Sequence, residues 1–179
     1  EKVVPANRGY KVKSGTGDFH GRAVILAAPP HRASPLVGEM NDGMGSVLAG
    51  LPMSPVTLIH WAHENKGFNF PQGFGFLMPR INNLRVLGTL FPSQLFSGRA
   101  NGGFQLFASF YGGMLDKEAL TLQDNDQMNL LVKEHRKIFG FDMGSPEFSR
   151  IMRYPNAIPQ LLPDHPQKIN YLEKEAENS

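Results

Sequence analysis

Two neighbouring apolar segments constrain the fold more than any other feature of the chain. They read GFGFLMP at residues 73–79 and LGTLFPS at residues 87–93. Their composition and short separation predict an antiparallel pair of strands. Glycine inside a strand often marks the close approach of a ligand or of another backbone. Gly73, Gly75 and Gly88 therefore favour an apolar wall that suits a large, flat ligand.

The many aromatic residues of this region have a simpler interpretation, which is the core of a β layer. For each aromatic residue considered singly, the core is the better interpretation, because buried positions favour large apolar side chains. Only their interleaving with glycine favours a ligand wall. The residues concerned are Phe68, Phe70, Phe74, Phe76, Phe91, Phe96, Phe104, Phe107 and Phe110.

Composition limits the class of protein. The 179 residues suffice for one domain, and 41% hydrophobic with 19% charged residues is typical of a globular fold. The net charge of +2 and the scattered basic residues do not favour nucleic-acid binding. The absence of cysteine excludes disulfides and thiolate zinc sites, and it fits the reducing, cytoplasmic location that we expect. No apolar run reaches the about 18 residues that indicate a transmembrane helix.

The other segments predict an α+β fold, a mostly antiparallel sheet with one long helix and several short helices. The long helix is expected at 123–139, with Gly140 as its C-terminal stop and His135 as a core histidine on its apolar face. We expect a buried strand at 22–28, a Pro-rich segment at 155–166 and a charged tail at 171–179 that frays. Further strands are expected at 10–13, 56–62, 104–111 and 147–153, and short helices at 35–40 and 46–50.

Motifs of enzyme chemistry are missing from the sequence. There is no GxGxxG dinucleotide fingerprint, P-loop, nucleophile elbow or HExxH motif. His60 and His63 are three residues apart, so on a strand they point to opposite faces and do not clamp one metal ion. Trp61 lies in the middle of the same strand and is expected in the core. We therefore predict no catalytic residue and no metal site in the chain.

Five ordered strings resemble the flavin-dependent, oxygen-dependent protoporphyrinogen oxidase family. They are VILAAPPH, GFGFLMP, LGTLFPSQLFSGRA, FASFYGG and RYPNAIPQ, and together they extend over about residues 10–170. The resemblance implies an FAD-dependent enzyme of haem and chlorophyll biosynthesis that oxidises protoporphyrinogen IX to protoporphyrin IX with oxygen. It also implies that this chain is a portion of the substrate domain of a flavin oxidase.

The resemblance also implies roles for individual residues. Those that match the wall around the tetrapyrrole substrate are Phe74, Gly75, Leu77, Leu90 and Phe110. Those that match the surroundings of the flavin are Ala27, Ala28, Pro29 and Tyr154, and at Tyr154 the family usually has tryptophan. A tetrapyrrole is large and mostly apolar, so broad contact with such side chains would hold it. The flavin carries the redox chemistry, and the protein orients the reacting carbon.

Some expected parts of that family's pattern are absent from these 179 residues. The FAD fingerprint, the arginine that pairs with a substrate propionate and the closing Gly-rich flavin motif have no counterpart here. We therefore expect residues 1–170 to be an incomplete substrate-binding domain that binds no FAD and is inactive alone. The expected partners are the tetrapyrrole, the FAD-binding remainder of the enzyme and, through exposed strand edges, further copies of the chain. Association of the whole enzyme with a membrane surface stays open.

Two alternatives remain open at this point. The chain could be a non-catalytic module that binds a porphyrin or a partner subunit, in which case porphyrin binding would be tight without flavin. It could also belong to another flavin oxidase, such as a coproporphyrinogen or amine oxidase, although the LGTLF string favours the protoporphyrinogen branch.

Overall fold

The structure is a computed structural model that describes residues 1–65 and 67–177. Contacts between residues divide the chain into two compact units. The first unit comprises Glu1–Pro52 and Pro159–Ser179, and the second comprises Met53–Ile158. The division by contacts does not test whether residues 1–170 bind a substrate together. The substrate-binding domain at 1–170 therefore stays a prediction.

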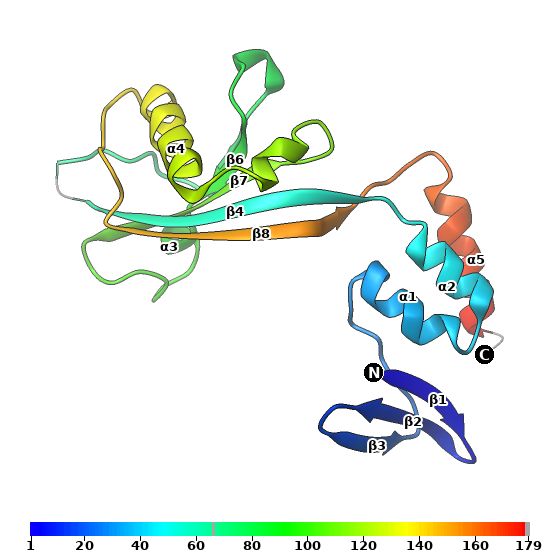
Figure 1. Ribbon diagram of the computed structural model, residues 1–179. Coiled ribbons are helices and arrows are strands. Elements are labelled where there is room, and N and C mark those ends of the chain that lie inside the picture. The colour runs from blue at the N-terminus through cyan, green and yellow to red at the C-terminus, as the bar shows by residue number, and fades with distance from the viewer. Residues whose placement is uncertain (66, 178–179) are drawn as a thin grey trace. The chain divides into compact units, whose positions relative to one another are not determined.

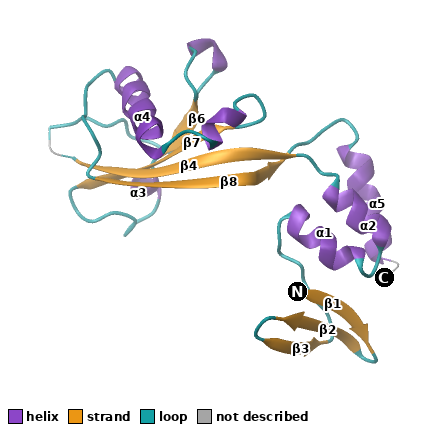
Figure 2. Ribbon diagram, viewed as in Figure 1, coloured by secondary structure: helices purple, strands orange, loops and turns teal. Residues whose placement is uncertain are grey.

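The first unit combines a small antiparallel sheet with three helices (Figure 2). The strands are β1 (Lys2–Ala6), β2 (Gly9–Ser14) and β3 (Gly17–Gly21), in that order across the sheet. The helices are α1 (Pro30–Gly38), α2 (Asp42–Ala49) and α5 (His165–Glu177).

Asparagine 41 links two of these helices. The side-chain oxygen of Asn41 caps α2 by accepting a hydrogen bond from Met44 N at 3.0 Å. Its Nδ2 donates to Glu175 of α5 at 2.8 Å. The expected fraying tail from residue 171 is therefore wrong as far as Glu177, because tertiary contacts with α2 order this charged segment. Residues 178–179 lie outside the described residues.

The segment at 22–28 corrects another prediction. The sequence predicted a strand buried on both faces, but no described strand pairs with residues 22–28, and most of them are exposed. The side chain of Ile25 is 92% exposed. A strand buried on both faces needs neighbours on each side, whereas in the described residues only Val24 and Leu26 of this segment are half-buried. The predicted helices at 35–40 and 46–50 exist, but both begin earlier, at Pro30 and Asp42.

The second unit is a five-stranded sheet with α4 (Asp124–Phe139) packed on one face, as Figure 1 shows. The strands lie in the order β5-β6-β7-β4-β8. Their bounds are β4 (Met53–Glu64), β5 (Gly75–Leu77), β6 (Val86–Leu90), β7 (Phe104–Gly112) and β8 (Phe148–Pro159). Shorter helical segments are η1 (Arg80–Asn82), α3 (Pro92–Leu95) and η2 (Lys117–Leu120). The predicted α+β class and the antiparallel pair β5–β6 are confirmed.

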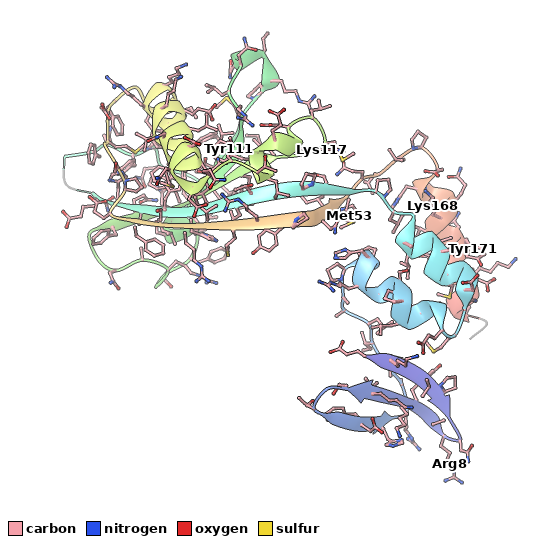
Figure 3. The ribbon with its side chains drawn as sticks, in the orientation of Figure 1. Arg8, Met53, Tyr111, Lys117, Lys168 and Tyr171 are labelled. Atoms are coloured by element: carbon pink, nitrogen blue, oxygen red, sulfur yellow. The ribbon has the colours of Figure 1, made fainter. Side chains whose placement is uncertain are left out.

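The core of this unit lies between the sheet and α4. Trp61 and Phe107 stack with their ring centroids 4.2 Å apart, and both are fully buried. Leu131 and His135 face them from α4, as the helical periodicity predicted. Tyr111 of β7, labelled in Figure 3, is also fully buried. Gly140 ends α4 with a φ of 78°.

Strand β8 is longer than the sequence indicated. The prediction ended it at residue 153 because Pro155 begins a Pro-rich stretch, whereas the strand continues to Pro159. β8 is an edge strand next to β4. Proline is tolerated at a sheet edge because its missing N–H is not needed by a further strand.

Candidate functional site

The strand register brings most of the predicted substrate-binding residues onto one face of the five-stranded sheet. Gly88 of β6 pairs with Leu77 of β5 on one side and with Phe110 of β7 on the other. In the neighbouring row, Leu90 pairs with Gly75 and with Ala108. Successive side chains of a strand alternate between faces, so residues two apart share a face.

That face is the one directed away from α4, and we call it the open face. Thr89, between Gly88 and Leu90, lies on the α4 side, because its hydroxyl is 2.9 Å from Nε2 of His135. Leu77 is 86% exposed on the open face, while Leu90 and Phe110 are half-buried. We call Leu77, Leu90 and Phe110 the apolar wall.

Gly88 makes the close packing of this wall possible. A Cβ atom at residue 88 would lie 2.6 Å from the carbonyl oxygen of Phe76 and 3.1 Å from Cδ2 of Leu77. The first distance is too short for any side chain, so glycine lets β5 and the Leu77 side chain approach β6. The Leu77 side chain therefore lies beside Gly88, in the row that also contains Phe110.

The other two residues predicted at the wall have different surroundings. Gly75 has a φ of 144°, and a Cβ there would collide with the carbonyl oxygen of Thr89. Residue 75 therefore has to be glycine because of its backbone conformation and the close approach of β6. Phe74 precedes β5, its carbonyl accepts a hydrogen bond from Phe91 N at 3.0 Å, and its side chain is 67% exposed. The register does not place Phe74 in either row of the wall.

The residues predicted near the flavin lie in both units. Tyr154 is on the open face of β8, because its neighbour Arg153 reaches the α4 side, where its Nη2 donates to Asp124 Oδ1 at 2.6 Å. The Tyr154 side chain is 44% exposed. Ala27, Ala28 and Pro29 belong to the first unit, where they form an exposed segment that leads into α1.

A buried chain of hydrogen bonds supports the wall from the α4 side. Trp61 Nε1–H donates to Ser109 Oγ at 2.8 Å, and Ser109 Oγ lies 2.9 Å from Thr89 Oγ1. Thr89 Oγ1 is 2.9 Å from Nε2 of His135, whose Nδ1 is 2.9 Å from the carbonyl oxygen of Leu131. An indole only donates and a carbonyl only accepts, so Ser109 Oγ accepts from Trp61 and His135 Nδ1–H donates to Leu131. The Ser109 hydroxyl also lies 3.2 Å from His135 Nε2, so either Ser109 or Thr89 can donate to this ring nitrogen. Burial lowers the pKa of His135 to about 4, against a smaller opposite effect of the Leu131 carbonyl, so His135 is neutral and its Nε2 accepts.

Glu134 shapes β6 beside this chain. Its carboxylate is almost completely buried and accepts hydrogen bonds from Arg85 N at 2.7 Å and Val86 N at 2.9 Å. The register between β6 and β7 shifts between Val86 and Gly88. Such a bulge reverses the alternation of the strand, so it decides that Gly88 and Leu90 lie on the open face. Burial, and then the Glu134 charge, raise the pKa of Tyr111 well above its ordinary value.

Sequence reasoning missed Glu134 as a site-forming residue. Glu134 is next to His135, which was predicted to lie on the apolar face of the helix, and this position was the available signal. A carboxylate on an amphipathic helix is ordinarily expected on the solvent-exposed side, so the signal was weak.

A groove of about 520 Å³ continues the open face beyond the wall. It is lined by His60, Ala62, Arg99, Ala100, Asn101, Phe104, Leu106, Glu147, Phe148 and Arg150. His60 pairs with Ala108 and Ala62 with Leu106, so the groove begins in the row that contains Leu90. Burial, and then the charge of Arg150, lower the pKa of His60, which is therefore neutral at pH 7. The sequence did not single out either arginine, because their proximity depends on the packing of β8 against β4.

His60 and His63 lie on opposite faces of β4, as predicted. His63 is buried on the α4 side, and its Nδ1 is 3.0 Å from Glu147 Oε2. Within residues 1–65 and 67–177, no group of three or more histidine or acidic side chains is arranged to hold a metal ion. In the same described ranges, no helix is both long and apolar enough to span a membrane.

Comparison with known proteins assigns the family. Residues 1–170 match a protein family described as flavin containing amine oxidoreductase. The chain belongs to this family. This chain is 25% identical over 167 residues to protoporphyrinogen oxidase 1, chloroplastic, of Arabidopsis thaliana, covering 89% of the chain and 31% of the relative. It is 22% identical over 160 residues to coproporphyrinogen III oxidase of Bacillus subtilis, covering 84% of the chain and 32% of the relative.

Solved structures share the fold of this chain. A provisionally assigned protoporphyrinogen oxidase from Exiguobacterium sp. 255-15 matches with a TM-score of 0.72 at 15% identity, over 98% of this chain and 38% of that protein. Cyclohexylamine oxidase from Brevibacterium oxydans matches with a TM-score of 0.63 at 13% identity, over 86% of this chain and 33% of that protein. The chain thus spans about a third of the length of the relatives that it matches. The predicted resemblance to protoporphyrinogen oxidases is confirmed.

Proposed function

We propose that this chain forms the substrate side of an FAD-dependent oxidase that converts protoporphyrinogen IX to protoporphyrin IX with oxygen. The observation that carries the proposal is the alignment of Leu77, Gly88 and Phe110 in one cross-strand row of the open face. Exposed apolar side chains on a rigid sheet suit a wide, flat ligand, which gains affinity from area of contact. The relatives named above include oxidases of both protoporphyrinogen and coproporphyrinogen, and the LGTLF string favours the former.

The residues predicted near the flavin suit contact with an aromatic ring system, each within its own unit. Ala27, Ala28 and Pro29 are exposed, small or lacking a donor, and none belongs to a strand of the described sheets. Tyr154 offers an exposed phenol on the same face as the wall. A bound flavin would supply the acceptor for the hydride. The residues of this chain would hold the macrocycle in position and exclude water from its apolar face.

Porphyrin titration of the 179-residue chain tests the wall. We expect weak, saturable binding of protoporphyrin IX, measured by the change in its absorbance and by quenching of Trp61. Leu77→Ala and Phe110→Ala should each weaken binding about tenfold, because each removes about 1.4 kcal/mol of apolar contact. Leu161→Ala is the matched control, since Leu161 is 76% exposed in the first unit.

Three other outcomes have clear meanings. Equal affinity of the wall variants and the unchanged chain, or no binding at all, would contradict the proposed wall. Tight binding that flavin does not alter would favour the alternative of a non-catalytic porphyrin-binding module. The expected self-association of the chain and its cytoplasmic location stay predictions.

Flavin binding gives a separate test of the incomplete cofactor site. We expect the purified chain to show no flavin absorbance after addition of FAD and gel filtration, because its sequence contains no dinucleotide fingerprint to hold the pyrophosphate. A stoichiometric flavin spectrum after gel filtration would show that the described residues suffice for the cofactor.

A further inference from the structure

The groove beyond the wall contains cations that have no acidic partner. Arg99 follows α3 and Arg150 lies on β8, and both line the groove. Neither forms an ion pair with a residue in the described ranges 1–65 and 67–177. The Cζ atom of Arg99 lies 5.7 Å from the centroid of the Phe96 ring, close enough for a cation–π contact. Two arginine residues from separate elements thus line one hollow of the open face.

The other lining residues offset only part of this positive charge, because Glu147 supplies one carboxylate against two guanidinium groups. Glu147 is the acidic residue of the groove, and its Oε2 lies 3.0 Å from Nδ1 of His63, which is buried on the α4 side. His60 is neutral at pH 7 and offers one N–H donor. Leu106, Phe104 and Phe148 supply apolar sides. The groove therefore combines an apolar lining with positive charge, which fits a carboxylate attached to an apolar body.

We propose that Arg99 and Arg150 bind the carboxylate groups of the planar ligand whose apolar body lies on the wall. This inference rests on the proposed function and adds the charged end of the same ligand. Leu106 at the groove is four residues from Phe110 at the wall, which corresponds to about 13 Å along β7. One amphipathic macrocycle with acidic arms on one edge can therefore contact both regions. Arginine suits this role, because its planar fork forms two parallel hydrogen bonds to one carboxylate.

The test compares two probes with the same macrocycle, protoporphyrin IX and its uncharged dimethyl ester, both delivered from the same mild detergent. Arg99→Gln with Arg150→Gln should weaken binding of the free acid about tenfold or more and leave binding of the ester unchanged. The affinity of the unchanged chain for the free acid should fall with added salt, and its affinity for the ester should not. Arg8→Gln is the control, because Arg8 is an exposed arginine of the first unit (Figure 3).

The outcomes separate this inference from the proposed function. If the double arginine variant binds the free acid as the unchanged chain does, while Phe110→Ala weakens binding, the arginine site is wrong and the wall stands. The double arginine variant could instead lose affinity for the free acid and keep its affinity for the ester, while Leu77→Ala and Phe110→Ala bind normally. In that case the wall is wrong and the arginine site stands. If neither probe binds to the unchanged chain, the wall and the arginine site are both wrong. The two arginines are exposed, so a normal thermal unfolding curve of each variant is expected and excludes misfolding as the cause.

Discussion

Replacing Glu134 with alanine is expected to lower the free energy of unfolding by about 2–4 kcal/mol, because two backbone N–H groups at the β6 bulge lose their acceptor in a dry environment. The groups are those of Arg85 and Val86, and Val86 is 1% exposed. Glu134→Gln keeps one acceptor oxygen and should have about half of the effect. Urea denaturation followed by the fluorescence of Trp61 measures both changes.

The neighbouring residue supplies the control for this experiment. Lys133→Ala removes an exposed side chain from the same turn of α4 and should change stability by less than about 0.5 kcal/mol. Hydrogen exchange provides a second measurement, since Glu134→Gln should accelerate exchange of the β6 amides at Val86–Leu90. If Glu134→Ala unfolds at the same urea concentration as Lys133→Ala, the carboxylate does not hold the bulge.

The chain should also lose stability as the pH falls from 6.5 toward 4, because His135 titrates in that range. Its pKa is lowered from 6.5 to about 4 in the folded state, so the unfolded chain takes up the proton first. The stabilisation is complete above pH 6.5 and decreases below it. A shift of this size corresponds to about 3 kcal/mol at the acidic end. The pKa values of His60 and His63 are also lowered, mainly by burial, so they contribute with the same sign.

Comparison of variants isolates the contribution of His135. His135→Gln should be less stable at pH 7, because it disrupts the buried hydrogen bonds to Thr89 and Leu131, but its stability should change less between pH 6.5 and 4. His20→Gln, an exposed position on β3, should keep the pH dependence of the unchanged chain. An unchanged slope in His135→Gln would exclude His135 as the group that is held neutral.

Local sequence signals predicted the elements that depend on local physics. The α4 helix follows from its apolar periodicity and from Gly140, and β4, β6 and β7 follow from apolar, β-branched and aromatic runs. The burial of Trp61 and His135 follows from the same patterns. The segment at 22–28 shows where such reasoning fails, since an apolar run indicates a tendency to be buried but does not supply neighbours.

The candidate site needed more than those signals. The two apolar segments and the FASFYGG string, together with the resemblance they carry, are sufficient to propose a hairpin, a tetrapyrrole wall and the residues Leu77, Leu90 and Phe110. It does not contain the register between β6 and β7, because the bulge held by Glu134 comes from an element 48 residues away along the chain. The meeting of Arg99 with Arg150 has the same origin, since long-range packing of β8 beside β4 brings them to one groove. Alternation within a strand is a local property, whereas the partner of each residue across the sheet depends on the whole fold.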